Sequence, residues 1–285
     1  MKEQFSTFCN KNNPQNMEEA INYFTIFGGL DIRVNTTLPI EDQIQDIILD
    51  DYKHLRNIIG DIATQDPLLQ SILSGAAMGD SRTNSSFRRA NVSFDNGMDC
   101  VEELCDLGAI TINRSLHHLT NQKSDSEIAK KLTFTTPFLR FWFAFVSPIF
   151  KGVRDGEYTE FYKNFENKKL EFTNLIFEQL CHEFIKCSFD EDSIDQIGRY
   201  WDNEVEIDLV AKTYSGKIIV GSCRYTNSKI KKTELTKIKD DCEHIELKPD
   251  IIVLFSKKGF TNEVKSLKGD GFKLYTVKSL KALIS

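Results

Sequence analysis

The apolar positions of residues 17–60 recur at helical spacing. The clearest set is a group of isoleucines, Ile40, Ile44, Ile47 and Ile48. The dipeptide Gly28-Gly29 interrupts the pattern, so we expect helices on both sides of it. Residues 1–16 are polar and rich in asparagine, and we expect this end to be frayed. The segment 1–60 is therefore predicted to be helical.

Residues 61–136 combine three helical patterns with two short strands. Asp66-Pro67 predicts a helix start, because aspartate caps helices and proline is tolerated in the first turn. Gly108 offers the left-handed conformation that ends a helix. The expected helices and strands are Leu68–Met78, Ser85–Val92, Asp95–Leu107, Ala109–Ile112 and Leu132–Thr135. Their order predicts a winged helix-turn-helix, with the polar segment between the two strands as its wing.

Residues 137–166 are predicted to be an aromatic helix, Pro137 to Phe150, followed by a charged connector that reaches about Asn167. The apolar run is about 13 residues long, and Arg140 and Pro148 interrupt it. A membrane-spanning helix needs roughly 20 apolar residues. We therefore expect a buried helix and no membrane partner.

Residues 167–285 are predicted to be an α/β domain in a chain that is α+β overall. An acidic loop, 190–195, follows the first helix of this domain. The expected elements are a helix Lys168–Lys186, strands Glu204–Lys212 and Lys217–Tyr225, a helix Lys232–Asp241, strands Asp250–Phe255 and Lys273–Val277, and a helix Ser279–Ile284. We interpret the order as αβββαβ followed by βα.

The composition of the chain bears on its cellular compartment and on its possible contacts with nucleic acid. Seven cysteines form no CxxC pair, and an odd count without metal-ligand spacing suits a reducing, cytoplasmic compartment. The polar start, Met1 to Asn13, does not look like a signal peptide. The net charge of −6 means that any nucleic-acid contact would have to come from a local basic patch.

The predicted hairpin carries the candidate chemistry. Side chains on a strand alternate between its two faces, which places Ile207 with Leu209 and Glu206 with Asp208. On the second strand, Ser222 and Arg224 share a face and can lie across from the two acids. Glu178 on the preceding helix could reach the same cleft. These five polar residues form the candidate site, with Asp208 and Glu206 as the metal ligands if Mg²⁺ or Mn²⁺ binds.

Several segments resemble a known family. They are Phe177-Glu178, Gly198-Arg199-Tyr200-Trp201-Asp202, Glu206-Ile207-Asp208-Leu209-Val210 and Gly221-Ser222-Cys223-Arg224-Tyr225. Together they look like domain of unknown function 234, which follows the ATPase module in a family of archaeal and bacterial AAA-type ATPases. Residues 136–143 resemble that family's helix after the winged helix, and Gly28-Gly29 resembles the end of its ATPase lid. The resemblance implies a winged helix followed by a PD-(D/E)xK nuclease-like fold.

Two departures from the family pattern bear on activity. The family has Glu-Cys-Lys where this chain has Ser222-Cys223-Arg224. Mg²⁺ prefers charged oxygen ligands, and an arginine stays protonated, so it cannot take a proton from water. The catalytic set of Asp208, Glu206, Glu178 and Arg224 is therefore expected to be degenerate, and no cofactor is expected. No G-x-x-x-x-G-K-[ST] sequence is present, so ATP is not an expected partner.

Two features give opposite indications about nucleic acid. The third helix of the expected winged unit has five acids and no base, which would repel a duplex: Asp95, Asp99, Glu102, Glu103 and Asp106. In contrast, residues 217–239 contain seven bases and one acid. The candidate contacts are Arg224, Lys229, Lys231 and Lys232 to phosphate, and Trp201 stacked on a base. A solvated basic helix and a packed loop tryptophan are the alternatives.

Three hypotheses follow. The first is a degenerate nuclease-fold protein, not an enzyme, that binds nucleic acid or acts as a regulatory module. The second is an active Mg²⁺- or Mn²⁺-dependent DNA nuclease with rearranged ligands. The third is a protein-interaction module, which partners a separate ATPase or associates with itself, suggested by the acidic third helix and the aromatic segment 138–150.

Overall fold

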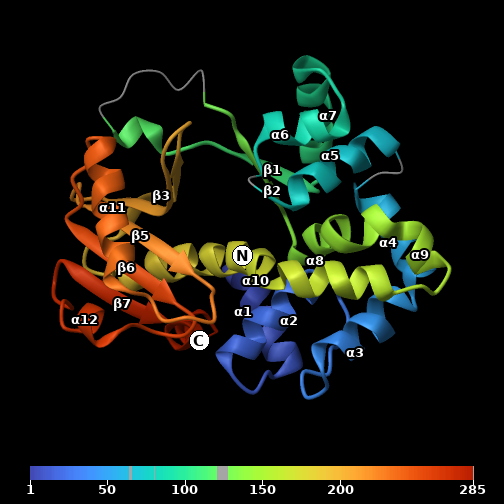
Figure 1. Ribbon diagram of the computed structural model, residues 1–285, viewed down its shortest axis with the longest axis horizontal. Helices are drawn as coiled ribbons and strands as arrows, with labels where there is room; N and C mark the ends of the chain where they lie inside the picture. The colour runs from blue at the N-terminus through green and yellow to red at the C-terminus, as the bar shows by residue number, and fades with distance from the viewer. Residues whose placement is uncertain (64–65, 80, 121–127, 285) are drawn as a thin grey trace.

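Helices fill the amino-terminal part of the protein and a five-stranded sheet fills the carboxyl-terminal part, so the fold is α+β as predicted (Figure 1). The computed structural model describes residues 1–63, 66–79, 81–120 and 128–284. In the first 63 residues the elements are α1 Lys2–Asn12, α2 Met17–Phe27, α3 Ile40–Ile44, the π-helical turn η1 Gln45–Leu49 and α4 Tyr52–Ala63.

The amino-terminal end is ordered by buried aromatic side chains. Helix α1 buries Phe5 and Phe8, and both rings pack on Phe24 of α2, with centroids 5.1 and 5.7 Å apart. The expectation that residues 1–16 are frayed is therefore wrong. The polar composition concealed two phenylalanines three residues apart, a spacing that puts them on one helix face.

The elements predicted between residues 67 and 134 are confirmed, with boundaries shifted by one or two residues. They are α5 Pro67–Ala77, α6 Thr83–Ala90, α7 Phe94–Asp106, β1 Ile110–Asn113, the 3₁₀ turn η2 His117–Leu119 and β2 Lys131–Phe134. The Asp66 carboxylate caps α5 by accepting the amide of Leu68 at 2.6 Å, and Gly108 is left-handed with φ +73°. Strands β1 and β2 pair antiparallel. Part of the expected wing, residues 121–127, lies outside the described residues.

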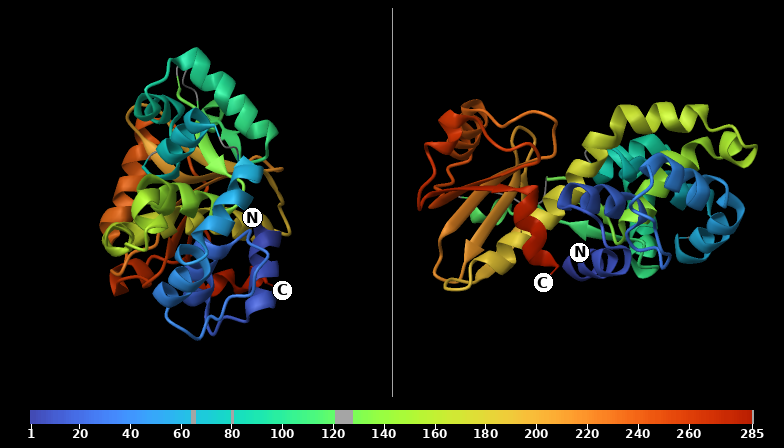
Figure 2. Two further views of the ribbon diagram at one scale, coloured as in Figure 1. Left: turned by 90° about the vertical axis from the view of Figure 1, so that its right-hand side faces the viewer. Right: turned by 90° about the horizontal axis from the view of Figure 1, so that it is seen from below.

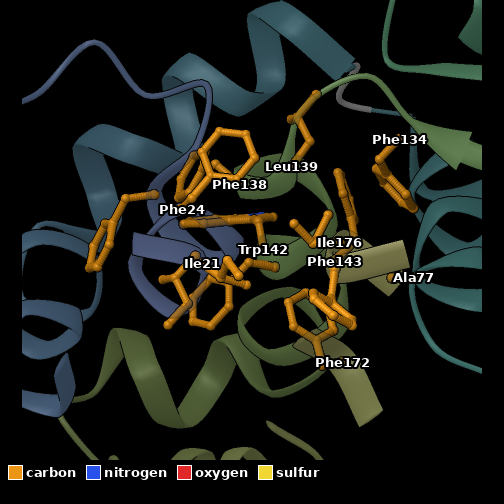
Figure 3. Close-up of a cluster of buried hydrophobic side chains, with 14 of the residues drawn as sticks. Ile21, Phe24, Ala77, Phe134, Phe138, Leu139, Trp142, Phe143, Phe172 and Ile176 are labelled. Carbon is orange, nitrogen blue, oxygen red and sulfur yellow. The ribbon is translucent and has the colours of Figure 1, made fainter. Parts of the chain in front are cut away.

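The aromatic segment forms the centre of the helical part. It comprises α8 Pro137–Phe141, the π-helical turn η4 Trp142–Val146, the 3₁₀ turn η5 Ser147–Ile149 and α9 Phe150–Arg154. Figure 3 shows Phe24 and Trp142 in one cluster with Phe143 and Phe172. Much of this segment is thus buried in the core. The segment 138–150 therefore no longer supports the hypothesis of a protein-interaction module. None of the described helices meets the length and apolarity needed to span a bilayer.

One long helix joins the helical part to the sheet. Helix α10, Thr159–Ser188, runs for 30 residues between the two (Figure 1). The charged connector expected up to residue 167 is therefore wrong from Thr159 onward. Phe161 and Phe165 lie four residues apart on α10 and pack edge-on against Phe141, which stabilises the helix through the charged stretch.

The sheet has the order β3-β4-β5-β6-β7. Its strands are β3 Ile194–Trp201, β4 Glu206–Thr213, β5 Ile218–Arg224, β6 Ile251–Ser256 and β7 Phe272–Thr276. The first three strands are antiparallel neighbours, whereas β5, β6 and β7 are parallel. The αβββαβ order is confirmed, and β3 occupies a segment for which no range was predicted, so Asp195 belongs to a strand rather than to the acidic loop.

Helices cover both faces of the sheet. Helix α10 and the carboxyl-terminal 3₁₀ helix η6, Val277–Leu283, pack in the core that continues into the helical part. Helices α11, Lys232–His244, and α12, Asn262–Lys265, pack in a separate core on the opposite face. Helix η6 also contacts α1 and α2, which brings the two ends of the chain close together (Figure 2).

Candidate functional site

A β-bulge in β4 sets the direction of Asp208. Strand β3 advances two residues from Gly198 to Tyr200, while β4 covers three from Val210 back to Ile207. One extra residue in a strand breaks the alternation of side chains. Accordingly, Ile207 packs in the α11 core and Leu209 in the α10 core. The prediction that Ile207 and Leu209 share a face is wrong for this reason.

One oxygen of the Asp208 carboxylate is engaged by β5. Its Oδ2 accepts hydrogen bonds from the Cys223 amide at 2.8 Å and from Arg224 Nη1 at 2.9 Å, and it lies 3.1 Å from Ser222 Oγ. The paired register of β4 and β5 runs no further than Leu209 opposite Gly221. Asp208 therefore supplies, from its side chain, the acceptor that a backbone carbonyl would otherwise offer to Cys223.

Glu234 on α11 completes this group. Its Oε1 accepts from Ser222 Oγ at 2.6 Å and from Arg224 Nε at 2.9 Å, and Arg224 Nη2 lies 2.7 Å away. Burial would raise the pKa of Glu234, but Ser222 and Arg224 outweigh it and hold the pKa below its ordinary value. Sequence reasoning missed Glu234, although it is the single acid in the basic segment 217–239.

A second charged group surrounds Glu178 on the opposite, α10 face. Glu178 is 2% exposed, and its Oε1 lies 2.9 Å from Arg199 Nε. Glu206 pairs with Arg199 and accepts from Lys131 Nζ at 2.6 Å. Burial raises the pKa of Glu178 to about 8 even though Arg199 acts in the opposite direction. Burial likewise lowers the pKa of Lys131.

The structure therefore divides the predicted site into two groups. Asp208, Ser222 and Arg224 come together with Glu234, whereas Glu178 and Glu206 come together with Arg199 and Lys131. Among the described residues, Glu206 and Asp208 have no hydrogen-bond partner in common. The expectation that the two acids share a face is wrong, because the bulge lies between them. Lys131 is distant in sequence, and no local signal pointed to it.

A small cavity of about 210 Å³ adjoins the Glu178 group. Its wall includes Lys131, Arg199 and His182, whose ring nitrogen Nε2 hydrogen-bonds the Asp208 carbonyl at 2.8 Å. Burial lowers the pKa of His182 to about 4, so its ring is neutral near pH 7. Through this hydrogen bond, His182 supports the β-bulge of β4 from the α10 face of the sheet.

The acids of the site are arranged for ion pairing. Mg²⁺ and Mn²⁺ need carboxylate oxygens that converge on one point. Among residues 1–63, 66–79, 81–120 and 128–284, no three His, Cys, Asp or Glu side chains converge in this way. Arg224 contacts Asp208, and Arg199 contacts Glu178 and Glu206, so guanidinium groups stand beside the acids proposed as ligands. The present donor set does not fit a divalent cation.

The residues predicted to contact nucleic acid fall into two classes. Lys229, Lys231 and Lys232 are exposed in the segment that follows β5, and Lys232 lies 3.5 Å from Glu263. Trp201 is 1% exposed, lies on β3 rather than in a loop, and donates its indole N–H to the Ala129 carbonyl at 2.8 Å. Trp201 as a base-stacking residue is therefore a wrong prediction, because its ring is inside the core.

Comparison with known proteins matches one part of the chain. Residues 142–238 match the model of DUF234, a family described as archaeal and bacterial proteins of unknown function. The matched segment contains α10, β3, β4, β5 and the beginning of α11, and so both charged groups except Lys131. No curated protein and no solved structure matches the chain.

Proposed function

We propose that this protein is a nuclease-fold module that has exchanged metal-dependent hydrolysis for nucleic-acid binding. The fold-level support is the succession α10-β3-β4-β5-α11-β6, which has the αβββαβ order of PD-(D/E)xK nucleases. Fold order by itself does not define chemistry. The observation that carries the proposal is the ion-pair group of Asp208, Arg224 and Glu234.

The ion-pair group explains why hydrolysis is lost. One guanidinium lies between two carboxylates, with Arg224 2.9 Å from Asp208 and 2.7 Å from Glu234. A divalent cation near Asp208 would meet this fixed positive charge. Ser222 offers a neutral hydroxyl, and its hydrogen bonds tie it to the same two acids. An arginine cannot become a base at any ordinary pH, and the two carboxylates that could act as bases are paired with Arg224, so we assign no activation of water to this set.

Binding is assigned to the exposed lysines that follow β5. Lys229, Lys231 and Lys232 lie a few residues beyond Arg224, at the carboxyl end of the strand that carries the degenerate site. Flexible, exposed lysines contact phosphates without reading bases. The affinity should therefore depend on salt more than on sequence.

The same proposal gives the α5–β2 unit a different task. Three helices followed by two antiparallel strands have the order of a winged helix, which also suits the resemblance to AAA-type ATPases. Its third helix, α7, exposes all five acids, which have no ion pair among the described residues: Asp95, Asp99, Glu102, Glu103 and Asp106. A duplex would be repelled by this helix. We therefore assign the unit to protein contact rather than to DNA.

Fluorescence anisotropy with labelled single-stranded, duplex and branched DNA tests the binding. We expect the variant Lys229→Glu, Lys231→Glu, Lys232→Glu to lose about tenfold or more in affinity at low salt, since three phosphate contacts become repulsive. The matched control changes three exposed lysines on the helical part, Lys53→Glu, Lys151→Glu and Lys163→Glu. Equal loss in both variants, or no DNA binding by the unaltered protein, contradicts the proposal.

Cleavage assays with Mg²⁺ or Mn²⁺ test the loss of chemistry. The unaltered protein and Asp208→Ala are both expected to leave DNA intact over many hours. Cleavage that needs Asp208 would instead support the active nuclease with rearranged ligands.

A second candidate function is self-association through α7. Phe94 and Leu107 lie at the two ends of α7, and their side chains are 58% and 43% exposed, so both offer apolar surface to a second copy of the chain. Light scattering tests this candidate: a mass that rises with concentration and falls to the monomer in Phe94→Ser supports it. A monomer at all concentrations removes it.

A further inference from the structure

A cleft of about 1230 Å³ lies away from the charged groups described above. Its walls come from α2, the segment 38–40, α10 and the residues that follow β5, β6 and β7. Tyr225 holds these walls together, because its hydroxyl donates to Asn22 of α2 at 2.8 Å. The cleft therefore combines the amino-terminal helices and the carboxyl edge of the sheet.

The cleft lies at the carboxyl edge of the sheet, where the chain leaves β6 and β7 toward opposite faces. After β6, the chain passes to α12, which packs on the α11 face of the sheet. After β7, it passes to η6, which packs on the α10 face. Parallel sheets bind ligands beyond the carboxyl ends of neighbouring strands whose connections leave to opposite faces. Residues 257–259 and 276–278 lie at this point and line the cleft.

One end of the cleft is basic. Lys257 has a side chain 7% exposed, and its Nζ lies 3.1 Å from Glu18 and 4.7 Å from the centre of the Tyr225 ring. Lys258 also lies 3.5 Å from Glu18. Lys278 is exposed and has no ion pair among the described residues. Glu19 also lines the cleft beside Glu18, so three ammonium groups face two carboxylates and this end keeps a net positive charge.

The other end of the cleft has an apolar wall beside the ion pair of Lys169 with Glu166. The apolar side chains of this wall are Tyr23, Ile26, Leu38, Pro39, Ile40, Phe165 and Leu170. Leu38 is 45% exposed there and offers apolar surface to a bound molecule. A cleft with an apolar wall and a few charged groups at one end is typical of small-molecule sites.

We propose that this cleft binds a phosphorylated small molecule with an apolar or aromatic body. The phosphate contacts Lys257, Lys258 and Lys278, because a phosphate offers several acceptor oxygens to lysine ammonium groups. The body lies against the wall formed by Tyr23 and Leu38. The Glu18 carboxylate pairs with Lys257 and Lys258 at the position proposed for the phosphate. The bound ligand therefore displaces Glu18 from these two lysines. This site is independent of the proposed contacts to nucleic acid at residues 229–232.

Titration calorimetry with AMP, hexyl phosphate and inorganic phosphate tests the assignment. AMP and hexyl phosphate represent aromatic and aliphatic bodies, and inorganic phosphate has none. We expect at least one of the two esters to bind at one site, about tenfold or more tightly than inorganic phosphate. No binding of either ester overturns the proposal. Equal affinity for inorganic phosphate and the better ester overturns the role of the apolar wall.

Two pairs of lysine variants locate the binding. Lys258→Ala with Lys278→Ala removes charges from the cleft and should weaken ester binding about tenfold or more. Lys265→Ala with Lys268→Ala removes the same charge from exposed positions of the same domain that do not line the cleft, and should leave binding unchanged. Equal affinities in the two variants contradict the assignment.

Glu18→Gln tests the competition directly. The substitution keeps the shape of the side chain and removes the carboxylate that now pairs with Lys257 and Lys258. Ester binding should become severalfold tighter, while DNA binding should not change. Unchanged or weaker ester binding, in a variant that melts like the unaltered protein, counts against the site.

Discussion

The Oδ2 atom of Asp208 accepts a hydrogen bond from Nη1 of Arg224 at 2.9 Å, and the two residues come from neighbouring strands of the sheet. The same guanidinium reaches Glu234 on α11 at 2.7 Å. Three elements, β4, β5 and α11, are therefore joined by one positive charge. Asp208 and Glu234 therefore help to hold the sheet against a helix.

Replacing Arg224 should destabilise the fold. Arg224→Ala leaves Asp208 and Glu234 without their shared cation, and half-buried carboxylates without a partner are costly. Because the Arg224 side chain is 31% exposed, solvent screens part of the effect, and we expect a loss of about 1–3 kcal/mol in the free energy of unfolding. Urea denaturation measures this loss.

Two further variants sharpen the test of this pair. Arg33→Ala removes an exposed arginine that has no ion pair among the described residues, and it should cost little. Asp208→Asn in the Arg224→Ala background should recover part of the stability, since it removes one of the two unpaired charges. Arg224→Ala as stable as the unaltered protein would show that the pair is not a stabilising contact.

The stability of the protein should fall as pH rises from about 6.5 to 8. The folded state keeps a proton on Glu178, whose pKa is raised to about 8, whereas the unfolded chain has released it. Stability decreases with pH wherever the folded state binds more protons, by at most about 1.4 kcal/mol per pH unit for one group. Urea denaturation at pH 6.5 and pH 8 measures the slope, and Glu178→Gln should flatten it.

Between pH 6.5 and pH 8, His182 opposes Glu178 by at most about half a proton. Burial lowers the pKa of His182 to about 4, so between pH 4 and its ordinary value of 6.5 the unfolded chain holds the extra proton. In that range His182 makes stability rise with pH and opposes Glu178. The effect of His182 is complete only above about pH 7.5, where the unfolded chain has also lost this proton. Glu171→Gln, an exposed change on the same helix, should keep the original slope, and an unaltered slope in Glu178→Gln would contradict the assignment.

Gly221 is required where β5 passes β6. A Cβ atom at this position would lie 2.4 Å from Cγ2 and 2.7 Å from the carbonyl oxygen of Val253, a backbone atom that cannot move aside. Gly221→Ala should therefore destabilise the protein by about 1–3 kcal/mol, the usual effect of overpacking. Gly269→Ala, where nothing lies within 4 Å, should have little effect in the same thermal melts. Equal melting of the two variants would contradict this account.

Periodicity in the sequence predicted most of the elements and much of their order. Asp66-Pro67 marked the start of α5, and Gly108 marked the end of α7. These signals are local, because a cap or a glycine acts on residues within one turn of itself. Strand β3 was not located, since the acids around it obscure its apolar positions.

The sequence predicted which residues belong to the candidate site, but not how folding groups them. Alternation along a strand put Glu206 with Asp208, and one extra residue in β4 placed them in different charged groups. Nothing in the local pattern of a strand reveals a bulge or the partner that a bulged side chain meets.

By itself, the sequence determined most of the succession of helices and strands, the α+β class and the identity of the polar residues Ser222 and Arg224 on one strand. The tertiary structure alone decided that Glu234 pairs with Arg224, that Lys131 reaches Glu206 and that Trp201 is buried. The physical reason is the separation along the sequence of the residues that interact. Hydrogen bonding within a helix or hairpin depends on near neighbours, whereas the pairing of these charges depends on residues that only folding brings together.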